Sequence, residues 1–96
     1  MSRISMDHVR LTEISSGFAK QGNILEEVIT EMNSLTAQAA EEWQGAAATS
    51  FAQEYQDLLP SFKNMRQLAE DVSKQLSDSA KAVRELDEKM AGSFGV

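Results

Sequence analysis

Apolar residues recur every three or four positions along the first half of the chain. The steps alternate between three and four, with Gln21 in the one polar gap, at Leu11, Ile14, Phe18, Leu25, Val28, Met32, Leu35 and Ala39. This period covers one side of an α-helix and matches the heptad repeat of helices that pack along their length. Ser5 is a suitable N-cap, and Asp7 favours the positive helix N-terminus. We therefore predict a helix over residues 7–42.

The second half of the chain carries an equally regular stripe. Its members are Phe51, Tyr55, Leu58, Phe62, Met65, Ala69, Val72, Leu76, Ser79, Val83, Leu86 and Met90. Pro60 interrupts it, and a proline inside a helix costs about 3 kcal/mol or more. The stripe nevertheless keeps its phase through Pro60, which predicts one bent helix over residues 46–90. Gly92 and Gly95 then predict a frayed tail over residues 91–96.

Trp43-Gln44-Gly45 is the only strong punctuation between the two stripes. Glycine adopts positive φ without strain, so Gly45 can end one helix and turn the chain. Trp43 can close the open end of the resulting hairpin with its large apolar ring. We expect residues 43–45 to form the turn of a single all-α domain over residues 1–96, an antiparallel helical hairpin.

Two helices alone leave apolar residues uncovered beside both stripes, namely Ile24, Ile29, Leu59 and Leu68. Burying one such side chain fully is worth roughly 1.5–3 kcal/mol, so a dimer forming a four-helix bundle is expected. Glycine inside a helix costs about 1 kcal/mol relative to alanine, and close approach of a partner helix would explain it. We therefore predict a dimer interface that includes Ser15, Gly17, Ala19 and Gly22; drift on an exposed face is the alternative.

The charges are unevenly distributed along the chain. The net charge is −6, which argues against nucleic acid as a partner. No Lys or Arg lies between Lys20 and Lys63, whereas that segment contains Glu26, Glu27, Glu31, Glu41, Glu42, Glu54 and Asp57. The acidic segment is either a plain solvated face or a means of orienting two hairpins. In the second case repulsion between acidic turn ends favours an antiparallel homodimer.

The sequence offers no catalytic constellation. Cysteine is absent and His8 is the only histidine, so we expect no catalytic, cofactor-binding or metal site and a protein that is not an enzyme. Residues 1–10 lack the apolar core of a cleavable signal peptide, and no stretch approaches the roughly 20 apolar residues of a membrane span.

A chain of this length, with two long helices and a central Trp-x-Gly turn at Trp43 and Gly45, resembles the WXG family of ESAT-6-like proteins. Substrates in this family carry a C-terminal pattern of apolar, acidic, apolar and apolar residues, spaced by four, three and four. Val83, Asp87, Met90 and Phe94 match that pattern. Val83 stands where the actinobacterial pattern has tyrosine, which points to the homodimeric branch found in Firmicutes.

The resemblance implies a protein secreted through the type VII system as a folded dimer, without a cleaved signal peptide, and acting as a virulence or export co-factor. It also implies that the membrane ATPase of that system reads the C-terminal pattern. Two alternatives remain open. The chain could escort a larger type VII toxin with a similar hairpin, or its amphipathic helices could open onto a membrane at acidic pH.

Overall fold

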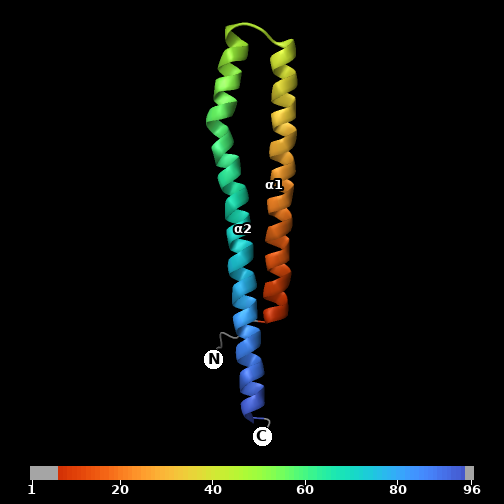
Figure 1. The fold of residues 1–96 in the computed structure, drawn as a ribbon, viewed down its shortest axis with the longest axis vertical. Coiled ribbons are helices and arrows are strands. Elements are labelled where there is room, and N and C mark those ends of the chain that lie inside the picture. The colour runs from red at the N-terminus through yellow and green to blue at the C-terminus, as the bar shows by residue number, and fades with distance from the viewer. Residues whose placement is uncertain (1–6, 95–96) are drawn as a thin grey trace. The chain divides into compact units, whose positions relative to one another are not determined.

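The computed structural model describes residues 7–94, and these form two helices joined by a short turn (Figure 1). Helix α1 spans His8–Glu42 and helix α2 spans Ala46–Phe94. The two helices form a hairpin, which confirms the predicted all-α fold.

The helix ends differ slightly from the predicted boundaries. Asp7 caps α1, since its Oδ1 accepts a hydrogen bond from the amide of Val9 at 2.9 Å; the predicted cap, Ser5, lies outside the described residues. Helix α2 continues through Pro60 without a break, as the phase of the stripe predicts. It ends at Phe94 rather than at residue 90, because a single glycine near a helix end costs only about 1 kcal/mol.

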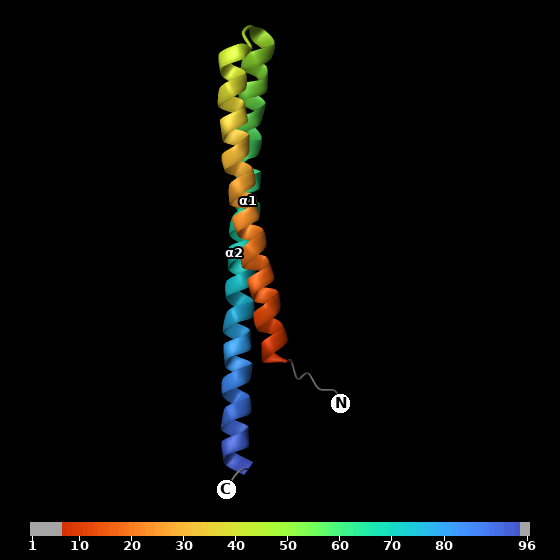
Figure 2. The ribbon, with the colours of Figure 1, turned by 90° about the vertical axis from the view of Figure 1, so that its right-hand side faces the viewer.

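The packing divides the hairpin into two compact units. Of the described residues, unit 1 contains 7–20 and 69–94, and unit 2 contains 21–68. In each unit a stretch of α1 lies beside a stretch of α2 (Figures 1 and 2).

Unit 1 is packed around small side chains. Leu11, Ser15, Ala69 and Ala80 are buried there. Ser15 Oγ donates to the carbonyl of Ser73 at 2.7 Å, and Ser73 Oγ donates to the carbonyl of Ser15 at 2.8 Å. Small residues let two helices approach closely, and the reciprocal hydrogen bonds satisfy the hydroxyls that this approach buries.

Unit 2 contains one large buried side chain, Ile29, which is 3% exposed. Gly22 is also buried. Two polar contacts join the helices in this unit: Tyr55 Oη to Asn33 Oδ1, and the Arg66 guanidinium to Glu26 Oε1. The ion pair is half-exposed, so its contribution to stability is modest.

The two helices face each other through heptad positions a and e. The a positions are Leu11, Phe18, Leu25, Met32 and Ala39 in α1 and Tyr55, Phe62, Ala69, Leu76 and Val83 in α2; the e positions are Ser15, Gly22, Ile29 and Thr36 in α1 and Leu59, Arg66, Ser73 and Ala80 in α2. All except Phe18 are buried or half-buried. The stripes read from the sequence paired each a position with the residue three later, position d. Most d residues are instead exposed, with Ile14 and Val72 half-buried.

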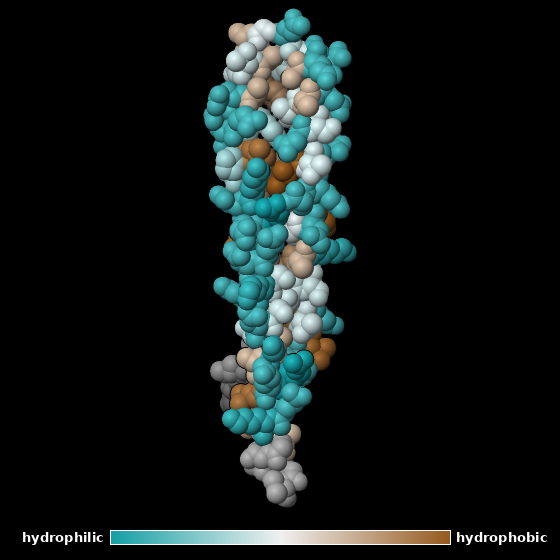
Figure 3. Space-filling model, in the orientation of Figure 1, coloured by the Kyte–Doolittle hydropathy of each residue, from teal (hydrophilic) through white to brown (hydrophobic). Residues whose placement is uncertain are grey.

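The face of the molecule turned to the viewer in Figure 3 is mainly hydrophilic; one group of apolar atoms lies between the helices in the upper part of the view, and smaller groups lie at the edges. Exposed ion pairs also form within single helices, such as Lys74 with Asp78 at 2.8 Å. The hydrogen bond from Lys74 to Asp78 raises the pKa of Lys74. Pairs of this kind contribute little to stability.

Candidate functional site

The turn is built around Gly45. The amide of Trp43 donates to the carbonyl of Ala39 at 2.8 Å, which completes the last turn of α1. Gly45 then adopts a φ of 108°, a conformation that residues with a Cβ rarely take. Its carbonyl accepts from the amide of Thr49 at 3.2 Å and so starts α2. The chain therefore reverses within three residues at the position that the sequence predicts.

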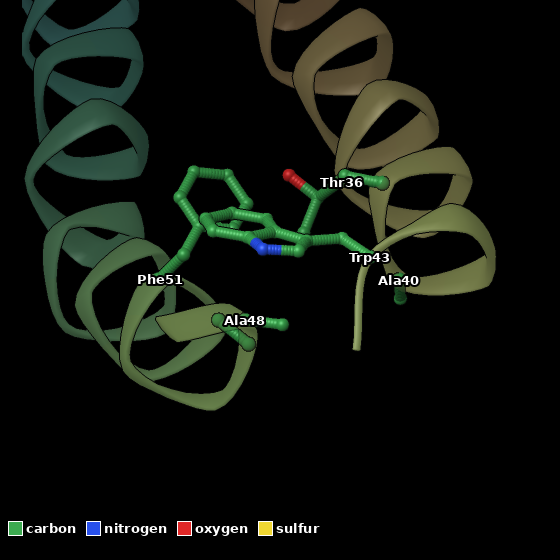
Figure 4. A pocket seen from close by; sticks show the side chains of 7 residues that line it. Thr36, Ala40, Trp43, Ala48 and Phe51 are labelled. Carbon is green, nitrogen blue, oxygen red and sulfur yellow. The ribbon is translucent and has the colours of Figure 1, made fainter. Parts of the chain in front are cut away.

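Trp43 reaches from the end of α1 towards the first turns of α2 (Figure 4). Its ring lies 5.5 Å from that of Phe51, with the planes tilted by 42°, a geometry that favours aromatic attraction. The ring is nevertheless 43% exposed. Small residues such as Ala40, Ala48 and Ala52 surround Trp43 and leave part of it exposed.

Those small residues leave hollows around the aromatic pair. One, of about 380 Å³, is lined by Ala40, Trp43, Gln44, Gly45, Ala48, Thr49 and Ala52. Another, of about 390 Å³, is lined by Met32, Leu35, Thr36, Ala39, Phe51 and Tyr55. Apolar residues predominate in the second. The turn end of unit 2 thus presents apolar surface rather than a finished core.

The four residues of the candidate export pattern lie along one side of α2. In heptad terms they occupy positions a, e, a and e, the same positions that face α1 elsewhere in unit 1. Val83 is half-buried, whereas Asp87 and Met90 are exposed. Figure 2 shows the reason: the end of α2 continues past the first turn of α1. Phe94 is the last residue of α2, and its side chain lies outside the described part.

The residues predicted to form the dimer interface are placed in two different environments. Ser15 and Gly22 are buried against α2 of the same chain. Gly17 and Ala19 are exposed, and a Cβ on Gly17 would meet no atom within 4 Å. In this structure the small residues at 15 and 22 serve the hairpin, and only 17 and 19 remain available to a partner.

A second group of exposed residues forms an apolar surface. We name it the d-face: Val28, Leu35, Phe51, Leu58 and Met65, all in unit 2 and all exposed. Position d follows position a by three residues, a rotation of about 300° around the helix axis, and position e follows it by four residues, a rotation of about 400°. Positions d and e therefore lie on opposite sides of position a. In an antiparallel pair the d residues of both helices consequently lie on the same side. The sequence stripes contained these residues but assigned them to the interior.

Within the described residues, neither helix is long and apolar enough to cross a membrane. That part of the chain also contains no group of three acidic or histidine side chains arranged to hold a metal ion. His8 is half-buried at the start of α1.

A two-helix hairpin reversed by a Trp-x-Gly turn, with apolar residues left exposed along both helices, defines a class of small all-α proteins. The family described as "Proteins of 100 residues with WXG" matches residues 3–88. The chain belongs to this WXG100 family, which is not a known enzyme family.

Similar proteins share this architecture along their whole length. The "Type VII secretion system extracellular protein A" of Staphylococcus aureus strain USA300 is 25% identical over 96 residues, covering 100% of this chain and 99% of that protein. The protein of the same name from strain MRSA252 matches equally well. The structure of Geobacillus thermodenitrificans EsxA, crystal form I, has a TM-score of 0.88 at 25% identity and covers 95% of this chain and 100% of that one. These findings place the chain among the type VII secretion proteins of the WXG100 family.

Proposed function

We propose that this chain is a non-enzymatic interaction protein that leaves the cell through a type VII secretion system as a folded homodimer. Two features support the proposal: the d-face, which lacks a partner within the hairpin, and the export pattern at the end of α2. The names of the secreted relatives point in the same direction.

A second copy of the chain is the proposed occupant of the d-face. Leu58 and Met65 are each more than half exposed, at 52% and 54%. Fully burying a side chain of this size is worth roughly 1.5–3 kcal/mol, and the d positions along a second hairpin would cover it and complete a four-helix bundle. Gly17 and Ala19 lie outside the d-face and would contribute where the partner passes close to α1.

Charge favours the antiparallel arrangement of the two copies. The turn ends are acidic, since residues 21–62 contain no Lys or Arg. A parallel dimer would place two such ends side by side. An antiparallel dimer instead places each turn end near the termini of its partner, where basic residues such as Arg10 and Lys20 are available. Exposed charges are screened beyond about 8 Å at physiological salt, so the preference is the sum of many small terms.

The end of α2 is the proposed export signal. Asp87 and Met90 occupy inner-face positions at a point where the described part of α1 has already ended. An exposed apolar and acidic strip on a rigid helix suits recognition in a groove of another protein. The membrane ATPase of the secretion system is the proposed reader of this strip, with Val83 anchoring its first turn against α1 and Phe94 extending it.

Export measured in the producing cell tests the proposal. Asp87→Asn and Met90→Ser should each reduce the secreted fraction strongly while leaving the melting temperature of the purified protein unchanged, because both side chains are exposed. Glu85→Gln is the matched control: it removes the same charge two residues away from Asp87, on the outward side of α2, and should be exported normally.

Two results would contradict the export signal. One is secretion of Asp87→Asn and Met90→Ser at the level of the unmodified protein. The other is an equal loss of secretion in Glu85→Gln, which would show that secretion depends on the overall charge of this region and not on Asp87. Recovery of a large partner protein in stoichiometric amount from the same cells would replace the homodimer by the escort role.

A further inference from the structure

The start of α1 and residues 77–84 of α2 enclose a polar hollow of about 260 Å³ in unit 1. Its lining residues are His8, Thr12, Ser77, Ala80, Lys81 and Arg84. Ala80 is buried, His8 is half-buried, and the other four side chains are exposed. Three of the six side chains are basic, in a protein whose net charge is −6.

The two permanent cations of this hollow are not neutralised by strong partners. No hydrogen bond or ion pair within the described residues engages the side chain of Lys81. Arg84 Nε lies 4.0 Å from Glu88 Oε1, and both side chains are more than half exposed, so this pair is weak. The nearby Asp78 already accepts a hydrogen bond from Lys74 at 2.8 Å.

We propose that this hollow binds a phosphate group. A guanidinium offers a planar pair of donors that matches phosphate oxygens, and an ammonium adds a compact charge. The hydroxyl of Ser77 and the imidazole of His8 can complete the contacts of a tetrahedral oxyanion, whereas the Thr12 hydroxyl already donates to the carbonyl of His8 at 2.8 Å. A carboxylate has only two oxygens and would leave more of these hydrogen-bond donors without an acceptor.

The hollow lies on one side of the inner face of unit 1. Its α1 residues occupy heptad positions e and b, and its α2 residues occupy b, e and f. These positions lie on the side of the inner face away from position d. Binding of phosphate at this hollow does not depend on the proposal for export.

A titration of the full chain with sodium phosphate, followed by amide NMR at constant ionic strength, tests the site. The amide signals of Thr12, Ser77 and Lys81 should move along a saturable curve. The double variant Lys81→Gln/Arg84→Gln should bind phosphate at least about tenfold more weakly, because it removes two charge-assisted contacts. Lys20→Gln/Lys63→Gln removes the same charge from exposed positions outside the hollow and should bind normally.

Arg84→Lys separates the effect of the guanidinium's bidentate geometry from the effect of its charge. It keeps the positive charge and should still weaken binding, because lysine has no bidentate geometry. Ser77→Ala removes one hydroxyl and no charge, so a weaker affinity there reports a direct contact. Amide shifts that rise linearly with phosphate and do not saturate would overturn the site. An equal loss of phosphate affinity in the two double variants would also overturn it.

Vesicles identify the source of the phosphate group. Sedimentation with phosphatidylglycerol vesicles that is lost in Lys81→Gln/Arg84→Gln, and that is absent with phosphatidylcholine, would identify a lipid headgroup. Saturable phosphate binding without sedimentation would identify a free phosphate compound. Sedimentation that the double variant retains, together with unsaturable phosphate shifts, would contradict both.

Discussion

The two units of this hairpin use similar heptad stripes in different ways. In unit 1 the e positions are small, with Ser15, Ser73 and Ala80, and the helices are joined by reciprocal serine hydrogen bonds of 2.7 and 2.8 Å. In unit 2 the e positions include Ile29 and Leu59, and the aromatic pair at the turn is only partly covered.

The two units also differ in which apolar side chains they leave exposed. Unit 2 exposes the whole d-face, whereas the d residues of unit 1 include two half-buried ones, Ile14 and Val72, and a polar one, Ser79. Unit 1 is therefore close to complete as a pair of helices up to Val83. Unit 2 resembles half of a larger core, and a second copy of the chain is the proposed source of the other half.

The largest effect on stability should come from the buried side chain of unit 2. Ile29→Ala removes a residue that is 3% exposed, and such truncations cost about 2–5 kcal/mol. Leu11→Ala is the matched change in unit 1, where Leu11 is 5% exposed. Chemical denaturation of both variants should give losses of similar size. A negligible loss for Ile29→Ala would mean that unit 2 has no core of its own.

Trp43→Ala should destabilise the protein less than the truncation of a buried tryptophan would. The ring is 43% exposed, so we expect about 1–2 kcal/mol rather than the 3–5 kcal/mol of a core aromatic. Thermal unfolding of the variant, with Phe51→Ala as its partner in a double-mutant cycle, measures the aromatic contact separately. A loss near the upper range would show that the dimer buries the ring.

Removal of the Ser15 hydroxyl should cost about 1 kcal/mol, the usual net value of one hydrogen bond. Ser15→Ala and Ser73→Ala together should cost less than the sum of the single losses, since each hydroxyl contacts the other serine. Strict additivity in urea denaturation would show that the pair is incidental. Ser15→Leu, in contrast, should destabilise unit 1 further by forcing the helices apart.

Gly17→Ala should produce the smallest change, and with the opposite sign. A Cβ there meets no atom within 4 Å, so the helix should gain about 0.5–1 kcal/mol. If Gly17 lies where a partner helix approaches, the same substitution should weaken self-association although it stabilises the hairpin. Analytical ultracentrifugation beside thermal unfolding separates the two effects. Unchanged association would move the dimer interface away from the predicted small residues.

Much of the fold follows from the sequence pattern. The stripe spacing predicts both helices, and Gly45 between the stripes predicts the reversal with positive φ. The stripe that keeps its phase through Pro60 also predicts one continuous helix. These features depend on local periodicity and on the conformational freedom of glycine, which a single sequence displays directly.

The choice between the two sides of each stripe could not be predicted in the same way. Positions a, d and e are mostly apolar or small, and hydrophobicity favours the large d residues for the interior. The hairpin instead buries Ser15, Gly22 and Ala80, because small residues permit close approach of two helices. For the same reason Ser15 and Gly22, predicted at the dimer interface, lie against α2. The basic hollow beside His8 also depends on the register of the two helices, which the sequence pattern does not specify.

The orientation of the two copies can be measured with one spin label at Thr49 of each chain, an exposed position beside the turn. An antiparallel dimer predicts a separation of roughly 50 Å, the length of about 35 helical residues at 1.5 Å each. A short distance, with the labels adjacent, would show that packing overrules the repulsion between acidic ends.

Sedimentation equilibrium of Leu58→Ser tests most directly whether the d-face binds a second copy. Leu58 is 52% exposed in the hairpin, so the variant should keep its helical content but dissociate far more readily. Two truncated side chains per dimer, at roughly 1.5 kcal/mol each, raise the dissociation constant about 100-fold. Val9→Ser, at an apolar side chain 56% exposed and outside the d-face, should leave the dimer intact. A monomeric unmodified chain, or equal association of both variants, would contradict the account.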